Sequence, residues 1–215
     1  DVRQIKNITD LALFERFLRL CAGRVGQILN LSSFADDLGV SHNTVRAWLT
    51  VLQTSYVVYL LRPYYRNFNK QIIKSPKLYF TDTGLAAYLL GIDTPKKVST
   101  HYLVGGLFEN LVVQEVLKDR TNRGVEPGLF FWRDKRGREV DLILEAPDRR
   151  IAVEIKSGQT VSSDFFTGLT YYGSLDDGCP PENRYLLYGG DLRENRSNAR
   201  VRGWKTLGDG EFPLD

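Results

Sequence analysis

Hydrophobic residues recur at helical spacing near the start of the chain. Residues 8–22 are predicted to form an amphipathic helix, with Thr9 or Asp10 as its cap. A short second helix is expected over residues 25–29. The apolar stripe of the first helix, spaced i, i+3, i+4 and i+7, comprises Phe14, Phe17, Leu18 and Cys21.

The segment SSFADDLGVSHNTVRAWLTVL, residues 32–52, predicts two short helices joined by a tight turn. Ser32 or Ser33 can cap the first helix, and Gly39 can end it as a C′ glycine does. Ser41 can cap the second helix. The apolar face of that helix comprises Val45, Trp48, Leu49 and Leu52. Such a pair of helices is typical of a helix-turn-helix.

The opposite face of the second helix is polar, with Asn43, Arg46 and Thr50 at i, i+3 and i+7. In a DNA-binding helix-turn-helix this helix enters the major groove. Asn43 and Arg46 are therefore candidate nucleic-acid contacts. The same fold also serves as a protein–protein adaptor, and Trp48 is expected in the core rather than at a contact.

Two β-branched and aromatic segments, residues 55–63 and 77–82, are predicted to pair as strands on either side of a basic stretch. A helix-turn-helix followed by such a hairpin predicts a winged helix. The five cations of this stretch are Arg62, Arg66, Lys70, Lys74 and Lys77, and no acid lies among them. We expect Arg62, Arg66, Lys70 and Lys74 to contact nucleic acid. A solvated loop edge is the alternative. A further helix over residues 82–91 and a polar linker over residues 92–100 are predicted to follow.

From residue 101 the pattern predicts a helix, three strands, a helix and two strands. The first helix is expected over residues 107–118. The strands are expected at 129–133, 139–145 and 151–156, then at RYLLYGG (184–190) and VRGW (201–204), with a helix beginning at Ser162 or Ser163 between the two groups.

Three acidic residues and one lysine lie where these elements normally carry aliphatic side chains. Glu109 lies nearly on the face of Val112, Val113 and Val116, so its carboxylate is predicted to point inward. Alternation places Asp141 opposite its aliphatic neighbours, and it places Glu154 and Lys156 together on one face of the next strand.

Such a set suits metal-assisted phosphodiester hydrolysis, because carboxylate oxygens bind Mg²⁺ and a lysine can stabilise developing negative charge. The alternatives are structural. Glu154 and Lys156 can form a same-face ion pair, Asp141 can be a solvated strand-end residue, and Glu109 can cap the helix or pair with Arg133 or Arg138. Glu115 and Glu145 are expected at the surface.

Composition limits the other possibilities. The 215 residues are 42% hydrophobic and 26% charged, and no apolar run reaches the roughly 18 residues of a membrane span. Cys21 and Cys179 match neither a disulfide framework nor a zinc site, so a reducing cytoplasm is expected. Residues 1–100 carry 13 Lys+Arg against 7 Asp+Glu, whereas residues 101–215 carry 16 against 19. The basic half favours a polyanionic partner, with DNA as the first choice. The chain contains no methionine and begins at Asp1, and we interpret it as part of a longer protein.

Asp141, the tripeptide Glu154-Ile155-Lys156 and helical Glu109 resemble the PD-(D/E)XK nuclease superfamily. The expected αβββαβ order also resembles the core of that superfamily. Gln159 lies where some members carry an accessory glutamine, but the Pro–Asp pair is not intact, because Asp141 follows Val140. This resemblance implies that Mg²⁺ (or Mn²⁺) is bound by Glu109, Asp141 and Glu154, that Lys156 assists the attacking water, and that Gln159 supports the substrate.

Longer segments resemble the C-terminal region of predicted prokaryotic AAA+-type ATPases, a region classed as a domain of unknown function. They are KSPKLYFTDTGLAAYLLGI, GGLFENLVVQEVLK, FFWRDKRGREVDLILE and AVEIKSGQTVSSDFFTGLTYY. The resemblance implies an N-terminal ATPase module elsewhere in the full-length protein. This chain has no G-x-x-x-x-G-K-[ST] phosphate loop, so we expect no ATP site here.

The predicted fold class is therefore α/β (α+β overall), with a winged helix-turn-helix region over residues 1–100 and a nuclease-like domain over residues 101–215. The expected function is that of a nucleic-acid-interacting module with a Mg²⁺-dependent phosphodiesterase site. The alternatives are a DNA- or protein-recognition module that does not cleave and regulates an ATPase, and a protein-interaction scaffold without nucleic-acid contact.

Overall fold

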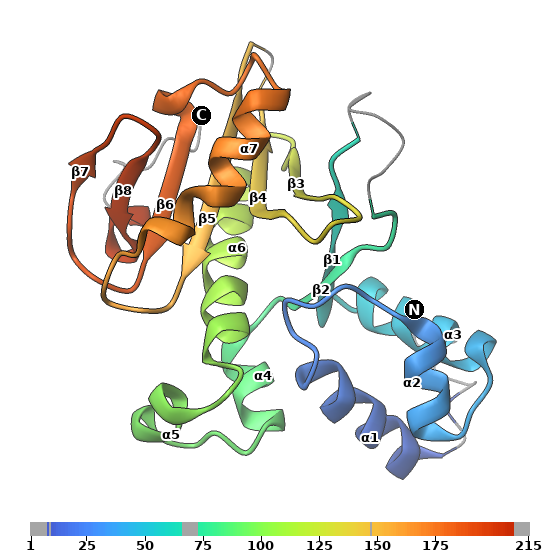
Figure 1. Cartoon of the computed structure of the whole chain (residues 1–215). Coiled ribbons are helices and arrows are strands. Elements are labelled where there is room, and N and C mark those ends of the chain that lie inside the picture. The colour runs from blue at the N-terminus through green and yellow to red at the C-terminus, as the bar shows by residue number, and fades with distance from the viewer. Residues whose placement is uncertain (1–7, 9, 66–72, 147, 209–215) are drawn as a thin grey trace. The chain divides into compact units, whose positions relative to one another are not determined.

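The computed structural model describes residue 8 and residues 10–65, 73–146 and 148–208 (Figure 1). Within these residues the protein is a mixed α/β structure with seven α-helices and eight strands. The chain divides into two compact units. The first comprises Asp1–Leu61 and Ser75–Asn110, and the second comprises Arg62–Lys74 and Leu111–Asp215.

The first unit is a helical body with one pair of antiparallel strands. Most of its helices begin at a side-chain cap, supplied by Asp10, Asn30, Ser41, Asp82 and Thr94. Its elements are α1 (Leu11–Ala22), α2 (Leu31–Leu38), α3 (His42–Thr54), most of β1 (Val58–Pro63), β2 (Lys77–Phe80), α4 (Thr83–Leu89), α5 (Pro95–Thr100) and the start of α6 (Val104–Asn122).

An aromatic cluster forms the centre of this unit. Phe17 of α1 contacts Phe34 of α2 edge to face and Trp48 of α3 at a tilted angle, and all three are almost fully buried. The apolar face predicted for α3 is buried as expected. Gly39 ends α2 in the left-handed conformation, with φ of +68°, which confirms its role as a C′ glycine.

Three predictions for this unit were wrong. The cap of α2 is Asn30 rather than Ser32 or Ser33. Residues 25–29 form turns and an isolated bridge from Ile28 to Lys77 instead of a helix, because Gly26 adopts a positive φ of +75°. The expected linker over residues 92–100 contains α5, which Thr94 caps and Pro95 opens at the first turn.

The second unit is built on a mixed sheet. Strands β3, β4 and β5 are antiparallel neighbours, β6 and β8 continue the sheet in parallel, and β7 closes the edge against β8. The end of β1, Arg62 and Pro63, runs parallel to β3. The strands are β3 (Leu129–Arg133), β4 (Glu139–Glu145), β5 (Arg150–Lys156), β6 (Arg184–Tyr188), β7 (Glu194–Asn195) and β8 (Arg200–Gly203).

Helix α7 (Thr167–Leu175) packs across one face of this sheet (Figure 1). Short 3-10 segments at Ser163–Phe166, Pro181–Asn183 and Trp204–Leu207 connect or end the elements. The core under α7 includes Trp132, Val140, Ile143, Ala152, Leu169, Tyr172 and Leu186. The elements from α6 to β6 follow the order that the sequence predicts, and the short β7 was not predicted.

Strand β4 contains a bulge beside its buried aspartate. Phe130 pairs with Ile143, but Trp132 pairs with Val140. Two residues of β4, Asp141 and Leu142, therefore face one residue of β3. A bulge of this kind bends the strand and redirects a side chain.

Among the described residues, no helix combines the length and the apolar character that a membrane crossing requires.

Candidate functional site

Two carboxylates lie on neighbouring central strands of the second unit, where the ladder between those strands ends. The last regular pair between β4 and β5 on this side is Leu142 with Val153. Asp141 and Glu154 come one residue beyond it, and both are buried, with 7% and 9% of their surfaces exposed. Burial of ionised carboxylates is costly unless charged or hydrogen-bonding partners compensate.

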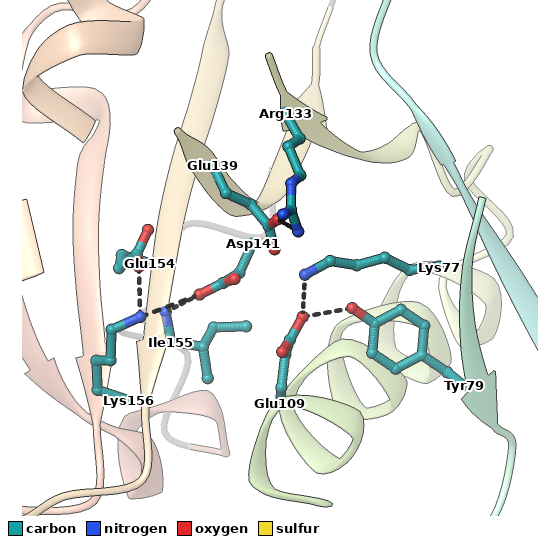
Figure 2. A network of polar contacts seen from close by, with 9 residues as sticks. All are labelled: Lys77, Tyr79, Glu109, Arg133, Glu139, Asp141, Glu154, Ile155 and Lys156. Carbon is teal, nitrogen blue, oxygen red and sulfur yellow. Dashed lines mark hydrogen bonds and ion pairs between the residues drawn. The ribbon is translucent and has the colours of Figure 1, made fainter. Parts of the chain in front are cut away.

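Lys156 provides that compensation from the end of β5 (Figure 2). Its Nζ forms an ion pair with Glu154 Oε1 and lies 3.7 Å from Asp141 Oδ2. The lysine side chain is 32% exposed, whereas the two carboxylate side chains are 10% and 12% exposed. One ammonium thus contacts both acids and also reaches solvent.

The backbone fixes the position of Asp141. Its Oδ2 accepts a hydrogen bond of 2.9 Å from the Ile155 backbone N–H, in the place where a ladder bond would otherwise continue (Figure 2). A buried N–H needs a partner, and the side chain supplies one because the strands have stopped pairing. The bulge and this hydrogen bond together hold Asp141 beside β5.

Helix α7 approaches the same site closely. A Cβ added at Gly168 would lie 2.1 Å from the Glu139 backbone oxygen and 3.5 Å from Glu154 Oε2. Only a residue without a side chain fits here, so Gly168 allows α7 to cover Glu154.

Sequence reasoning did not single out Glu139, which belongs to the same region. It stands two residues before Asp141 on β4, and each of the two offers one carboxylate oxygen within 4.8 Å of the other's. Arg133 on β3 donates to Glu139 Oε2 at 2.8 Å (Figure 2). The spacing Glu139-Val140-Asp141 was the available signal, because an acid two positions from a candidate ligand lies next to it along a strand.

Glu109 belongs to the first unit. Its Oε1 accepts from Lys77 Nζ at 2.7 Å and from the Tyr79 hydroxyl at 2.5 Å (Figure 2). The glutamate side chain is only 14% exposed, so the prediction of an inward-pointing carboxylate is confirmed. Its assignment as a metal ligand stays a prediction.

Lys77 corrects one part of the sequence interpretation. It was grouped with the cations of the basic stretch, yet its side chain is 2% exposed and forms an ion pair with Glu109. It is therefore not available to bind a polyanion. The strand alternation that places Lys77 and Tyr79 on one face was visible in the sequence, but their shared partner Glu109 lies 32 and 30 residues away from them.

Several other predicted residues lie at the surface. Gln159 is exposed in the loop after β5. Glu115 pairs with Lys118 on α6, and Glu145 accepts a hydrogen bond from the Tyr64 hydroxyl. The expectation of surface positions for Glu115 and Glu145 is confirmed.

The predicted nucleic-acid contacts are distributed over both units. Asn43 and Arg46 are exposed on α3 in the first unit, and Arg62 and Lys74 are exposed in the second. The other two predicted contacts, Arg66 and Lys70, lie outside the described residues. The roles of all six stay predictions.

Comparison with known proteins finds two families of unknown function. Residues 104–206 match the family described as a domain of unknown function, DUF4143. Residues 1–96 match a second, also described as a domain of unknown function, DUF8612. The expected resemblance to a domain of unknown function is thereby confirmed at this level.

Two curated mycobacterial proteins are similar to this chain. They are the uncharacterized protein Rv2008c of Mycobacterium tuberculosis and the uncharacterized protein Mb2031c of Mycobacterium bovis. Each is 31% identical over 162 residues, which cover 75% of this chain and 36% of the relative. The chain thus matches little more than a third of the length of these relatives. No solved structure gives a significant match.

Proposed function

We propose that the second unit carries a divalent-metal-dependent phosphodiesterase site that acts on nucleic acid. The observation that carries this proposal is the contact of Asp141 and Glu154, from adjacent strands, with the single ammonium group of Lys156. A cation already lies between two buried carboxylates, and Mg²⁺ prefers the same hard oxygen donors.

The donor set fits such an ion. Asp141 and Glu154 would hold it, and Glu139 offers a further carboxylate close to Asp141. When bound, the ion would polarise a phosphoryl group and lower the pKa of a bound water. The flexible side chain of Lys156 can move aside and place its ammonium where negative charge develops on the phosphate. Gln159, on the exposed loop after β5, would support the substrate.

The order α6-β3-β4-β5-α7-β6 supports the PD-(D/E)XK assignment. The first three strands are antiparallel and the fourth is parallel to the third, consistent with the αβββαβ core that the resemblance implies. Position 140, which carries Val140 in place of the expected proline, is fully buried in the core under α7.

For the first unit we propose a winged helix that contacts DNA. Support comes from the order of α1, α2 and α3 followed by antiparallel β1 and β2, with the Ile28–Lys77 bridge in addition. Asn43 and Arg46 lie exposed on α3 and would contact DNA in the major groove. Arg62, Arg66, Lys70 and Lys74, which belong to the second unit, would contact phosphates.

The test is calorimetric titration of Mg²⁺ and of Mn²⁺ into the wild type and four variants, followed by incubation with single- and double-stranded DNA. Asp141→Asn and Glu154→Gln are expected to abolish metal binding and cleavage. Glu115→Gln removes an exposed acid of the same unit and is expected to change neither. Glu109→Gln enters the same series, because the resemblance assigns a helical glutamate to the metal. Wild-type protein that binds no metal would refute the site.

A second function has support from the same contact. Because the Lys156 ammonium pairs with both Asp141 and Glu154 while its side chain is still 32% exposed, the unit can bind a phosphate backbone without cutting it. Under this alternative, DNA binding is independent of metal and no cleavage accompanies it. The same experiment therefore separates the two.

We further propose, from the resemblance alone, that an AAA+-type ATPase module forms another part of the full-length protein. The chain itself is expected not to bind ATP. Titration of the chain with ATP and Mg²⁺ tests this, and micromolar binding would contradict it.

A further inference from the structure

The β3–β4 hairpin tip, residues 134–138, is held rigidly from within. Asp134 is 9% exposed and closes the turn with its carboxylate. Its Oδ1 accepts from the Arg136 and Arg138 backbone N–H groups at 2.8 and 3.0 Å, and its Oδ2 accepts from the Arg138 side chain at 2.8 Å. Gly137 adopts a φ of +86°, which this tight turn requires.

The flanking arginines of this tip are already engaged. The Arg138 guanidinium pairs with Asp134 and lies 3.3 Å from the centre of the Tyr171 ring on α7. Arg133 pairs with Glu139. Burial alone would raise the pKa of Asp134, but the hydrogen bonds from Arg138 and from the Arg136 backbone, together with the charge of Arg138, lower that pKa below its usual value. The turn thus keeps its charged core ionised and fixed.

Lys135 and Arg136 are different. Both are exposed at the outermost part of the tip, and within the described part of the chain no acidic side chain pairs with either. Other exposed cations of the unit, such as Lys118, Arg123 and Lys205, each pair with an acid. Two neighbouring unpaired cations on a rigid turn form a preorganised binding surface for anions.

We propose that the Lys135–Arg136 tip is a phosphate-backbone contact that holds nucleic acid beside the carboxylate site. This inference rests on the proposed function and assigns its substrate-binding surface. Asp141 lies five residues beyond Arg136, which is at most about 17 Å along an extended chain. Successive phosphates of one duplex strand are spaced by about 3.4 Å along the axis, so the tip would bind within roughly five nucleotides of the carboxylates.

A nucleic acid fits this arrangement better than an acidic protein does. Under the proposed function, a ligand that binds the tip also reaches the site that contains the acids Glu139, Asp141 and Glu154. A regular chain of phosphates presents a charge to the tip whichever stretch is bound, whereas a protein would need an acidic patch matched to two residues. Sequence-independent binding with a steep salt dependence is therefore expected.

The experiment compares Lys135→Ala/Arg136→Ala with the control Lys118→Ala/Arg123→Ala, which removes the same charge from α6 and from the residue that follows it. Binding of a fluorescein-labelled 20-base-pair DNA to the full 215-residue chain is followed by anisotropy in EDTA, at 50 to 200 mM salt. Loss of two phosphate contacts lowers the slope of log affinity against log salt by about 1.8. Across this range the wild type is expected to lose about twelvefold more affinity than the tip variant, and the control is expected to match the wild type.

A tip variant with the wild-type slope would overturn the inference. So would equal competition by polyglutamate of the same charge, since that would assign the tip to an acidic protein. Lys135→Gln/Arg136→Gln, which keeps long side chains, serves if the alanine variant is unstable. Because EDTA separates binding from cleavage, tip-dependent DNA binding without cleavage in Mg²⁺ supports this inference and refutes the phosphodiesterase. Cleavage in Mg²⁺, together with a tip variant that keeps the wild-type salt slope, would support the phosphodiesterase and refute the tip as a phosphate contact.

Discussion

Replacement of Asp176 by asparagine should strongly destabilise the second unit. The Asp176 side chain is fully buried and accepts two hydrogen bonds of 2.5 Å from the Arg150 guanidinium. It also accepts from the Tyr172 hydroxyl at 2.9 Å and from the Gly178 backbone N–H at 3.0 Å. Every one of these partners is a donor. The NH₂ group of an asparagine would face these donors and could not accept from them. The largely buried Arg150 would also lose its counter-charge.

The magnitude follows from this geometry. Removal of one partner from a buried ion pair costs about 3–5 kcal/mol. At about 2.1 cal/mol/K per residue, a unit of this size has an unfolding entropy of roughly 0.25 kcal/mol/K, so Tm should fall by about 12–20 °C. Glu115→Gln, in a half-exposed pair with Lys118, should shift Tm by no more than about 2–4 °C. Thermal unfolding followed by circular dichroism at pH 7 measures both.

The pH dependence tests the same reasoning. Burial alone would raise the pKa of Asp176, but hydrogen bonds from Arg150, Tyr172 and Gly178 outweigh it and hold the pKa below 3.8. A lowered carboxyl pKa gives stability that is full above the unfolded value and is lost as pH falls through the folded value. The wild type should therefore exceed Asp176→Asn by a constant margin from pH 7 to 5, and the margin should shrink below 3.8. A shift below 3 °C at pH 7, or a margin unchanged by acid, would refute the reasoning.

Three further outcomes follow from the packing. Gly168→Ala should cost about 1–3 kcal/mol of unfolding free energy in urea denaturation, because its Cβ would clash with the Glu139 backbone oxygen. A Cβ at Gly158 meets no atom within 4 Å, so the control Gly158→Ala should be nearly neutral. Asn110→Ala should cost about 2–4 kcal/mol, since a fully buried amide that bonds both backbone groups of Phe80 would be lost; a cost below 1 kcal/mol would contradict this. Burial raises the pKa of Cys179 to about 11, so roughly 0.1% thiolate is present at pH 8, and a thiol reagent should label it only after denaturation. Rapid labelling of the native protein would contradict that burial.

Local patterns in the sequence were sufficient for most elements of the fold. Helix α3 was predictable because its four buried apolar residues share one face and Ser41 stands at its start. Strands β3 and β4 have the predicted bounds because Gly128 and the Asp134 turn interrupt the aliphatic runs. Strand β7 was missed because its two residues carry no periodicity.

The candidate site was predictable only in part. Alternation along β5 correctly grouped Glu154 with Lys156, since that depends on one strand alone. The pairing of Lys77 with Glu109, and that of Arg133 with Glu139, depends on register between segments that the sequence does not align. The hydrogen bond from Ile155 to Asp141 was likewise unpredictable, because it exists only where the ladder stops.

The bulge in β4 links the acid site to the alternation of side chains between the two faces of the sheet. Val140 and Ile143 are three residues apart, yet both belong to the core under α7, which a strand of strict period two does not allow. The additional residue resets the alternation between them. Deletion of Asp141 would leave Val140 and Ile143 two residues apart, so ordinary alternation would keep both on the face under α7. The carboxylate therefore stands on the additional residue of the strand, and its deletion would remove the bulge and the acid together while Val140 and Ile143 stay in the core.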